Sequence, residues 1–501
     1  MPYPDLQSFI ADLETRRQLK RVAAQVDPIL ELSEIADRVC KSPAADNAPP
    51  PATDPVHGRL GGHALLFENV KGSSLPCAIN LYGSYERMRL ALGCDNFEEL
   101  AGRVAQMVKP EIPTTLMDKV KKLPQLARMA GFGPKAVKSG ICQQVVRTDD
   151  ADVTELPVIQ CWPDDAGRYI TLGGMYTRCP DTGVRNVGMY RAQLFGPRQT
   201  AMHWHMHHDG ARYHRKYAAR GEPMPLAIVF GGESVLPYAA TAPLPPDVSE
   251  LLFAGFLNGR GIELVRCKTI DLEVPVNAEI VIEGLVHPTE TVFEGPFGDH
   301  TGYYSLGDQY PRYDITAITH RRDPIYPTTI VGKPPQEDYY LGKATERIFL
   351  PLLRLLVPDV IDYSLPMFGA FHNCVFVKIR KEYPMQARKV MSAIWGAGQM
   401  MFCKLIVVVD EHVNVHDEQE VLFHLGANWD PRRDTVIVDG PIDILDHAAP
   451  YLGTGSKMGI DATRKIAGEG RVREWPDELI MTDEIKQRVN RRWTEYGLSG
   501  P

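Results

Sequence analysis

The first hundred residues alternate between helical and strand-like hydrophobic patterns. Apolar residues recur at helical spacing after Asp5, which can cap a helix N-terminus. Short apolar runs between turn residues are typical of buried strands. The predicted strands cover residues 19–26, 64–67 and 76–80, and the predicted helices cover residues 6–13, 32–40, 85–92 and 97–108. This alternation predicts a small α/β domain within residues 1–138.

Two segments of the first 138 residues lack such periodicity. Residues 42–62 are rich in Pro, Ala, Asp and Gly, which predicts a surface excursion that buries little apolar area and stays mobile. Residues 109–138 are rich in Lys and Pro and are expected to be a connector that ends the first domain.

From residue 142 to about 320, short apolar runs recur between turn signals, which is typical of a β-barrel or sandwich. One predicted helix, over residues 249–257, interrupts this series of strand-like runs. We expect this all-β domain to span residues 139–327. The runs cover residues 169–176, 186–195, 226–230, 280–285 and 313–318.

After residue 328 the pattern returns to alternating strands and helices. A nearly continuous Ile/Val run is typical of a buried parallel strand. Residues 328–501 are therefore predicted to form a second α/β domain with a C-terminal tail. The expected strands cover residues 328–331, 374–379 and 404–409, and the expected helices cover residues 342–356 and 384–395.

Composition describes an ordinary globular protein. The 501 residues predict two or three domains, with 44% hydrophobic and 24% charged residues. A formal net charge of −8 disfavours a nucleic-acid-binding protein, which normally carries a basic surface. Nine scattered cysteines without a CxxC pair favour a reducing compartment. With no secretion signal at Met1 and no apolar run of ~20 residues, a cytoplasmic location is expected.

The densest set of chemical groups lies in Glu294-Gly-Pro-Phe-Gly-Asp-His-Thr-Gly-Tyr-Tyr304. Glycine and proline between Glu294 and Asp299 specify a tight, rigid loop rather than a helix or strand face. Such a loop can direct both carboxyl groups at one point, as paired acid–base chemistry requires. An ordinary β-turn explains the same letters equally well when the loop is considered alone.

The predicted strand Asn186-Val-Gly-Met-Tyr-Arg191 carries a candidate partner for a substrate carboxylate, because the planar guanidinium of Arg191 binds carboxylates bidentately. Alternation places Asn186 and Tyr190 on one face and Arg191 on the other, unless the strand bends. Taken alone, Arg191 is more simply a surface arginine.

Four histidines lie within Met202-His-Trp-His-Met-His-His-Asp209. Zinc binding is one interpretation, but the HExxH pattern is missing, so one metal ligand is expected here rather than three. Glu250 follows Ser249 at a predicted helix start and is either a helix-terminal acid or an oxygen ligand for Mg²⁺ or Mn²⁺. Lys457, within Gly453-Thr-Gly-Ser-Lys-Met-Gly459, is a weak candidate for a phosphate contact.

Together these segments resemble the UbiD family of prenylated-FMN-dependent decarboxylases, and nearly the whole chain takes part in the resemblance. The bacterial 4-hydroxy-3-polyprenylbenzoate decarboxylases are the most similar branch. The most specific matching segments are Cys161-Trp-Pro163, Asn186–Arg191, Asp271-Leu-Glu-Val-Pro275 and Glu294–Tyr304. The resemblance implies an N-terminal α/β domain, a central flavin-binding split β-barrel and a C-terminal α/β domain.

Residue roles follow from the resemblance. Catalysis is expected from Arg191, Glu294 and Asp299. A divalent ion, Mn²⁺ or Mg²⁺, is expected on Asn186, His207 and Glu250, with K⁺ beside it. Three further histidines, His203, His205 and His208, lie close to His207. The positions implied for prenylated FMN are Asn186, Met189, Tyr190, Arg191, His203, Trp204, His205, His208, Asp209 and Lys457.

The resemblance implies reversible, non-oxidative decarboxylation of an aromatic or α,β-unsaturated acid, with 4-hydroxy-3-polyprenylbenzoate of ubiquinone synthesis as one candidate. The expected proton donor is Asp299, and a carboxyl group in this role needs a raised pKa. A prenyl-FMN synthase would supply the cofactor. A homo-oligomer, dimer or hexamer, is expected, with peripheral attachment to the inner membrane if the substrate is prenylated.

Two departures from the family pattern put the substrate in doubt: the long excursion at residues 42–62, and His203-Trp-His205 in place of an Arg-Trp-Leu-like run. The alternatives are an FMN-dependent reductase or a non-catalytic flavin-binding subunit on the same barrel. A zinc hydrolase with His203, His205 and His207 as metal ligands is the third alternative. The acidic pair disfavours the reductase, which would not need two carboxyl groups on one loop.

Overall fold

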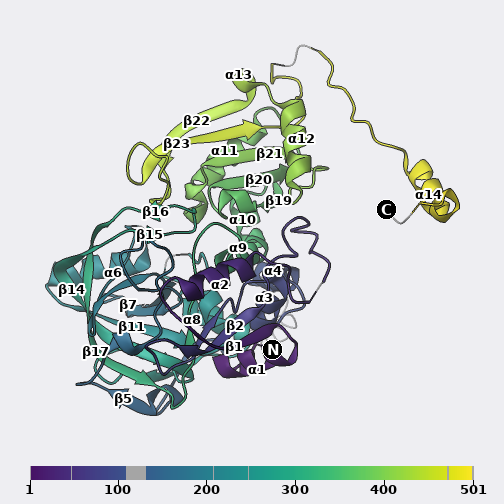
Figure 1. Ribbon diagram of the computed structural model, residues 1–501. Helices are drawn as coiled ribbons and strands as arrows, with labels where there is room; N and C mark the ends of the chain where they lie inside the picture. Colours follow the sequence, from purple (N-terminus) through teal and green to yellow (C-terminus); the bar gives the residue numbers. More distant parts are fainter. Residues whose placement is uncertain are drawn as a thin grey trace, which may run out of the picture.

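The computed structural model of the chain describes residues 2–46, 48–108, 131–206, 208–245, 247–470 and 473–498. Most of the expected connector and His207 lie outside these ranges. The N-terminal helices pack beside a strongly curled sheet, the C-terminal α/β region lies against both, and the tail runs away from the body to α14 (Figure 1). None of the helices in these ranges is both long and apolar enough to span a bilayer.

The N-terminal region is the predicted α/β unit, built on a four-stranded sheet of order β1-β2-β3-β18. Asp5 caps α1 by accepting a hydrogen bond from the Ser8 N–H at 2.7 Å, as the sequence indicated. The strands are β1 (Leu19–Val26), β2 (Ala64–Val70), β3 (Cys77–Ile79) and β18 (Tyr326–Pro327). The helices are α1 (Leu6–Thr15), α2 (Glu31–Cys40), α3 (Tyr85–Leu92) and α4 (Phe97–Val108).

The excursion at residues 42–62 is anchored to the N-terminal core by polar contacts, which the expectation of a surface segment with little buried apolar area did not include. Asp54 is 4% exposed and accepts hydrogen bonds from the hydroxyls of Tyr85 at 3.0 Å and Tyr339 at 2.8 Å. The carbonyl groups of Gly61 and Gly62 bind the guanidinium of Arg87. Polar groups, not apolar ones, hold this segment, and composition alone does not show them.

The central sheet is strongly curled (Figure 1). Its path runs β6-β9-β10-β17-β14-β11-β7-β8, with β5 also pairing with β17. Only Tyr190 and Arg191 separate β8 from β9, although these strands lie near opposite ends of the path. The expected single run over residues 186–195 is therefore two strands, and the fold is mixed α/β around a half-barrel sheet.

Two strands of this sheet, β14 and β17, form a long antiparallel pair that ends at the Glu294 loop. A smaller sheet of order β13-β12-β4 lies beside it. The strands of the central sheet are β5 (Val145–Arg147), β6 (Tyr169–Ile170), β7 (Gly174–Arg178), β8 (Arg185–Met189), β9 (Ala192–Gly196), β10 (Gln199–Ala201), β11 (Met224–Gly231), β14 (Ala278–Glu294) and β17 (Asp308–His320). Those of the smaller sheet are β4 (Lys135–Val137), β12 (Glu263–Arg266) and β13 (Glu273–Pro275).

Three helices accompany the curled sheet: α6 (Asp209–Arg220), α7 (Leu236–Ala239) and α8 (Glu250–Asn258). Ser249 caps α8 through its side chain, and Gly259 ends it in a left-handed conformation, so the predicted helix is confirmed.

The C-terminal region contains a five-stranded sheet of order β19-β20-β21-β23-β22, with β20, β21 and β23 parallel. The strand expected at residues 328–331 is wrong: the paired residues are those of β18, two positions earlier. The strands are β19 (Val360–Ser364), β20 (Cys374–Ile379), β21 (Leu405–Asp410), β22 (Thr435–Pro441) and β23 (Thr454–Asp461). The helices are α9 (Glu337–Ile348), α10 (Leu350–Leu356), α11 (Gln386–Trp395), α12 (Glu418–Asn428), α13 (Pro431–Asp434) and α14 (Asp483–Arg491).

The segments around residue 328 pack on the N-terminal unit. β18 pairs with β3, and the buried carboxylate of Glu337 accepts hydrogen bonds from the backbone N–H groups of Asn80 at 3.0 Å and Tyr82 at 2.9 Å. These contacts join the start of α9 to the first domain. The residue ranges expected for the three domains stay a prediction.

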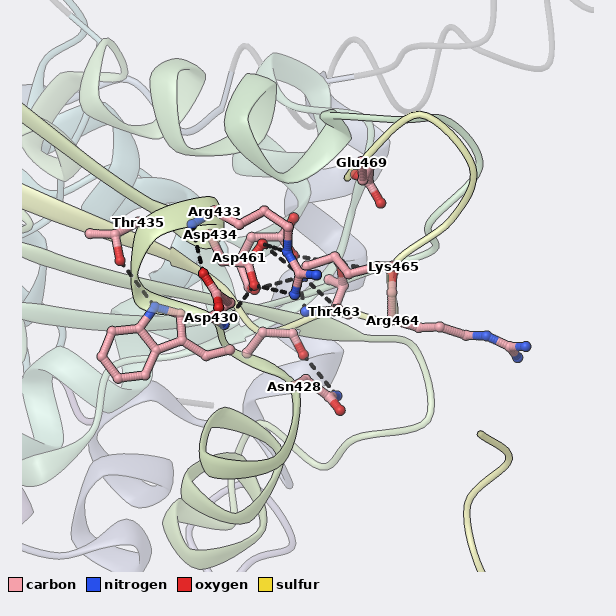
Figure 2. Close-up of polar contacts among 12 residues, drawn as sticks. Asn428, Asp430, Arg433, Asp434, Thr435, Asp461, Thr463, Arg464, Lys465 and Glu469 are labelled. Atoms are coloured by element: carbon pink, nitrogen blue, oxygen red, sulfur yellow. Dashed lines mark hydrogen bonds and ion pairs between the residues drawn. The ribbon is translucent and has the colours of Figure 1, made fainter. Parts of the chain in front are cut away.

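A buried ion-pair network fixes the chain after β23 (Figure 2). Lys465 contacts Asp461 at 3.1 Å and Asp434 at 3.6 Å, and Lys381 contacts Glu469 at 2.7 Å. Because each buried charge has a partner of opposite sign, residues 461–469 are held firmly against the sheet. The tail begins directly beyond them.

Candidate active site

Arg191 lies where β8 meets β9 and is the hub of a buried polar cluster. Its Nε donates to Oε1 of Glu294 at 2.8 Å, its Nη1 contacts Oδ2 of Asp299, and its Nη2 donates to Oγ of Ser305 at 2.9 Å. The guanidinium lies 4.7 Å from the centre of the Phe297 ring. Because β8 has already ended, strand alternation does not govern the direction of Arg191, and it points inward.

The two acids occupy neighbouring turns of one loop. Glu294 is the last residue of β14, and Asp299 opens the turn between β15 (Phe297–Gly298) and β16 (Tyr304–Ser305). The Asp299 N–H donates to the Tyr303 carbonyl at 3.1 Å, which closes that turn. The tight loop predicted from Gly and Pro is confirmed, and its small hairpin brings both carboxyl groups to Arg191.

Close packing explains the glycines of this loop. A Cβ on Gly298 would stand 2.1 Å from Cδ1 of Trp162, and one on Gly295 would stand 2.2 Å from Cβ of Ala166. The Asp165 carboxylate also binds the N–H groups of Gly298 at 2.7 Å and Trp162 at 2.8 Å. Asp165 was not identified from the sequence; an acid three residues after a tryptophan carries no distinctive signal.

The pKa of Asp299 is lowered, contrary to the raised pKa expected of a proton donor. Burial opposes its ionisation, but hydrogen bonds from His300 and the positive charge of Arg191 outweigh burial. Asp299 is therefore a carboxylate in this state. Glu294 is fully buried, and its Oε2 has no hydrogen-bond partner among the described residues.

His300 and His372 extend the cluster into the C-terminal region. His300 Nδ1 lies 3.0 Å from Oδ1 of Asp299, and its Nε2 lies 2.5 Å from Nε2 of His372. Burial disfavours protonation of His300, but its contact with Asp299 outweighs this effect and raises the pKa of His300. Burial and the neighbouring His300 lower the pKa of His372 to about 4. A protonated His300 thus donates to both neighbours. No sequence pattern pointed to His372.

The described histidines of residues 203–208 contact one another in a chain that begins at Glu294. His203 Nδ1 lies 2.9 Å from Oε1 of Glu294, and its Nε2 lies 2.8 Å from Nε2 of His205. The His205 N–H donates to Nδ1 of His208 at 3.1 Å. Burial and the neighbouring histidines lower the pKa of His205 to about 2, so its ring is neutral. His207, expected to bind metal, lies outside the described residues.

Asn186 and Glu250, two of the three expected metal ligands, lie side by side. Nδ2 of Asn186 donates to Oε1 of Glu250 at 3.1 Å, and the Val187 N–H donates to Oε2 at 2.7 Å. Burial raises the pKa of Glu250 to about 7, and the charge of Asp209 adds to this effect. A buried carboxyl group that is costly to ionise, beside a second acid, suits a site for a cation.

The first turn of α6 adjoins this pair. Tyr190 lies 4.8 Å from the His208 ring and makes an edge contact with Trp204 at 6.4 Å. A Cβ on Gly210 would stand 2.7 Å from Nε1 of Trp204, a buried donor without a partner among the described residues. Met189, the last residue of β8, packs at the edge of the neighbouring hydrophobic core.

Lys457 is the one expected cofactor residue whose contacts lie elsewhere. It is on β23, is 2% exposed, and donates to the Met401 carbonyl group. Burial lowers its pKa, which the nearby Cys403 partly opposes. Lys457 also lines a cavity of about 430 Å³ in the C-terminal region.

Three family models match the chain in order. The N-terminal domain model of 3-octaprenyl-4-hydroxybenzoate carboxy-lyase matches residues 10–104, the Rift-related domain model matches residues 135–334, and the C-terminal domain model matches residues 339–462. An uncharacterized protein of Aquifex aeolicus (strain VF5) is 49% identical over 497 residues, and one of Archaeoglobus fulgidus is 46% identical over 497 residues; each alignment covers 99% of both chains.

Solved structures of the same class share this fold over nearly the whole chain. The vanillic acid decarboxylase of Sedimentibacter hydroxybenzoicus, in a closed form, gives a TM-score of 0.83 at 26% identity and covers 100% of both chains. The UbiD-class enzyme HmfF of Pelotomaculum thermopropionicum, in complex with FMN, gives a TM-score of 0.77 at 29% identity and covers 96% of this chain and 98% of its own. The chain belongs to the UbiD family of carboxy-lyases.

Proposed function

We propose that this protein uses prenylated FMN to remove the carboxyl group of an aromatic or α,β-unsaturated acid, in a reversible, non-oxidative reaction. The carrying observation is the buried guanidinium of Arg191 between Glu294 and Asp299, 8% exposed and closed off by the Phe297 ring. Such a site combines a carboxylate receptor with two acids in a low-dielectric environment. Structures of HmfF contain prenylated FMN or FMN, which supports the cofactor assignment.

The residues around β8 fit the phosphate end of a flavin mononucleotide. Glu250 and Asn186 would hold a Mn²⁺ or Mg²⁺ ion, with His207 as third ligand and K⁺ alongside. The pKa of Glu250, raised to about 7 by burial, supports this, because a cation there would compensate the buried charge. The unpartnered Nε1 of Trp204, beside the first turn of α6, is a further donor suited to a phosphate oxygen.

Just after β8, Arg191 would bind the carboxylate of the substrate. When bound, prenylated FMN supplies the electron sink that loss of CO₂ from an sp² carbon requires. The substrate carboxylate would share the guanidinium with Glu294 and displace Asp299 from it. The buried Phe297 ring and Tyr310, which lies 4.3 Å from His203, restrict water around the reacting carbon.

Asp299 would acquire its proton only once the substrate is bound. In the described state, His300 and Arg191 lower its pKa. A second carboxylate on Arg191 weakens that stabilisation and adds a like charge nearby, and both effects raise the pKa of Asp299. Asp299 would then protonate the carbon that has lost CO₂, with His300 as its proton source. Burial of the cluster keeps competing water away from this transfer.

Substrate identity is proposed at the level of class. The family models bear the name of a 3-octaprenyl-4-hydroxybenzoate carboxy-lyase, which makes a prenylated 4-hydroxybenzoate of ubiquinone synthesis one candidate. His203, which contacts Glu294, and the neutral His205 beside it offer hydrogen bonds that also suit a small hydroxylated aromatic acid. CO₂ is the second product, a prenyl-FMN synthase would supply the cofactor, and the chain would work as a homo-oligomer.

The test is cofactor loading with and without Glu250. The chain, co-expressed with a prenyl-FMN synthase, should purify with prenylated FMN and one equivalent of Mn²⁺, and should release CO₂ from an aromatic acid in a substrate panel. Glu250→Ala should lose flavin and metal together, because Glu250 would hold the ion and the ion would in turn help to hold the cofactor. Glu263→Ala, at an exposed position on β12, is the control. Mass spectrometry, metal analysis and CO₂ detection are the readouts.

Two results would contradict the proposal. Glu250→Ala with full flavin and full Mn²⁺ would remove Glu250 from the ion site. A parent enzyme that carries FMN, reduces it with a nicotinamide donor and releases no CO₂ from any acid would indicate the flavin reductase instead.

A further inference from the structure

A second group of metal-ligating side chains lies in the C-terminal region, separate from the Arg191 cluster. His412 follows β21, His424 is on α12, and Glu478 is in the tail, so three separate segments contribute. Nε2 of His412 lies 3.1 Å from Oε2 of Glu478, and Nε2 of His424 lies 3.8 Å from Oε1. One ligand atom of each residue lies within 4.8 Å of the others.

We propose that His412, His424 and Glu478 form a Zn²⁺ site that fastens the C-terminal tail to the C-terminal domain. Two imidazole nitrogens and a carboxylate oxygen are a donor set typical of zinc with one open position. Tetrahedral ligands at ~2.0–2.1 Å from zinc lie about 3.3 Å from each other. The observed separations are 3.1 Å to Oε2 and 3.8 Å to Oε1 of the same carboxylate, so both imidazoles already lie near this distance from Glu478.

A simple ion pair explains this arrangement less well. Glu478 needs only one protonated histidine as its partner, yet two imidazoles converge on it with their ring centres 5.3 Å apart. Two imidazolium groups at that distance repel each other, whereas two neutral rings can both donate lone pairs to one cation. His424 is also 6% exposed in the structure with the tail in place, so its ring lies in a packed environment.

The position of the site in the chain gives it a structural role. The network around Lys465 holds residues 461–469 against the sheet (Figure 2). Further along the chain, Glu478 contacts His412 and His424 of the same domain. Beyond it come Leu479, Ile480 and Met481, all exposed, and α14, which has no buried residue in the described structure. Zinc would thus set the direction in which the tail leaves the body (Figure 1).

The experiment titrates Zn²⁺ into chelator-treated full-length protein and compares the parent with His412→Ala, His424→Ala and Glu478→Gln. Each variant should lose one equivalent of zinc or bind it at least about tenfold more weakly, since even residues outside the coordination sphere affect metal affinity to this extent. His287→Ala removes a comparable histidine–glutamate pair, 3.1 Å to Glu290, and is the control that should bind zinc as the parent does.

The second readout is tail cleavage. Zinc should slow tryptic cleavage within residues 473–492 in the parent and in His287→Ala, but not in Glu478→Gln. Because Glu478 is exposed, its substitution leaves the fold intact even if His424→Ala does not. Zinc binding to Glu478→Gln with parental stoichiometry and affinity would overturn the proposal. So would tail cleavage in the parent that does not respond to zinc.

Discussion

At the scale of single residues, the account depends on how charges are compensated around Arg191. One guanidinium, two carboxyl groups and a protonated His300 form a nearly neutral buried group. Removal of one member leaves an uncompensated charge, which is costly in a buried site. The low pKa of Asp299 follows from this arrangement, and it makes substrate binding the event that prepares the proton donor.

The His300–Asp299 contact predicts a pH-dependent contribution to stability. The folded-state pKa of His300 is raised above ~6.5, its ordinary value, so its contribution is present below that pH and is lost as pH rises through the folded pKa. The parent should exceed His300→Gln in free energy of unfolding by about 1–3 kcal/mol near pH 6, and by less at pH 9. Urea unfolding at the two pH values measures the difference.

Asp299→Asn provides the control for this pH effect. In that background, His300→Gln should change stability by a similar amount at both pH values, because the charge partner is gone. A His300→Gln effect in the parent that is equally large at pH 6 and pH 9 would contradict the assignment of a protonated His300.

At the scale of secondary structure, local sequence patterns predicted the helices and strands whose bounds depend on local interactions. Asp5 caps the helix it was expected to cap, the helix expected from Ser249 is formed as α8, and β20 has the predicted bounds. The failures have non-local causes. Tyr190 and Arg191 separate β8 from β9, which lie near opposite ends of the sheet, and β18 pairs with β3, a strand distant in the sequence.

The excursion at residues 42–62 yields a prediction opposite to the one that its composition suggested. Asp54→Ala leaves the buried hydroxyls of Tyr85 and Tyr339 without their acceptor, which should cost about 1–3 kcal/mol of unfolding free energy. Asp46→Ala, an exposed acid of the same segment, should stay within about 0.5 kcal/mol of the parent. The denaturant midpoints of the two variants and the parent measure this difference in stability. Equal stability of the two variants would show that Asp54 does not stabilise the excursion.

At the scale of the whole molecule, the C-terminal domain completes the site. Phe371 stacks on His300 with ring centres 5.0 Å apart, His372 accepts its hydrogen bond, and His447 lies 4.0 Å from the Tyr303 ring. These contacts join residues about 70 to 140 positions apart in the chain, so no periodicity or spacing could predict them. The acids of the Glu294 loop were identifiable from the sequence, whereas the residues that set their protonation were not.

Phe371→Ala tests whether this domain contact orders the active-site loop. Loss of the stacked ring should loosen residues 299–303, so their backbone amides should exchange hydrogen for deuterium several-fold faster. Phe368→Ala, at a 59% exposed position in the same segment, should leave the exchange unchanged. Mass spectrometry of peptides covering residues 296–305 gives the rates, and identical protection in all three proteins would mean that the loop is ordered without the C-terminal domain.

The most direct test of the account is decarboxylation by the cofactor-loaded Asp299→Asn enzyme. Asn keeps the size of Asp but cannot give a proton, and such groups contribute ~10²–10⁴-fold to rate. Turnover and solvent deuterium exchange into the product should both fall by that order, with flavin and metal retained, while Asp308→Asn, an exposed acid on β17, should match the parent. A well-folded, flavin-loaded Asp299→Asn enzyme with parental turnover and exchange would contradict the account.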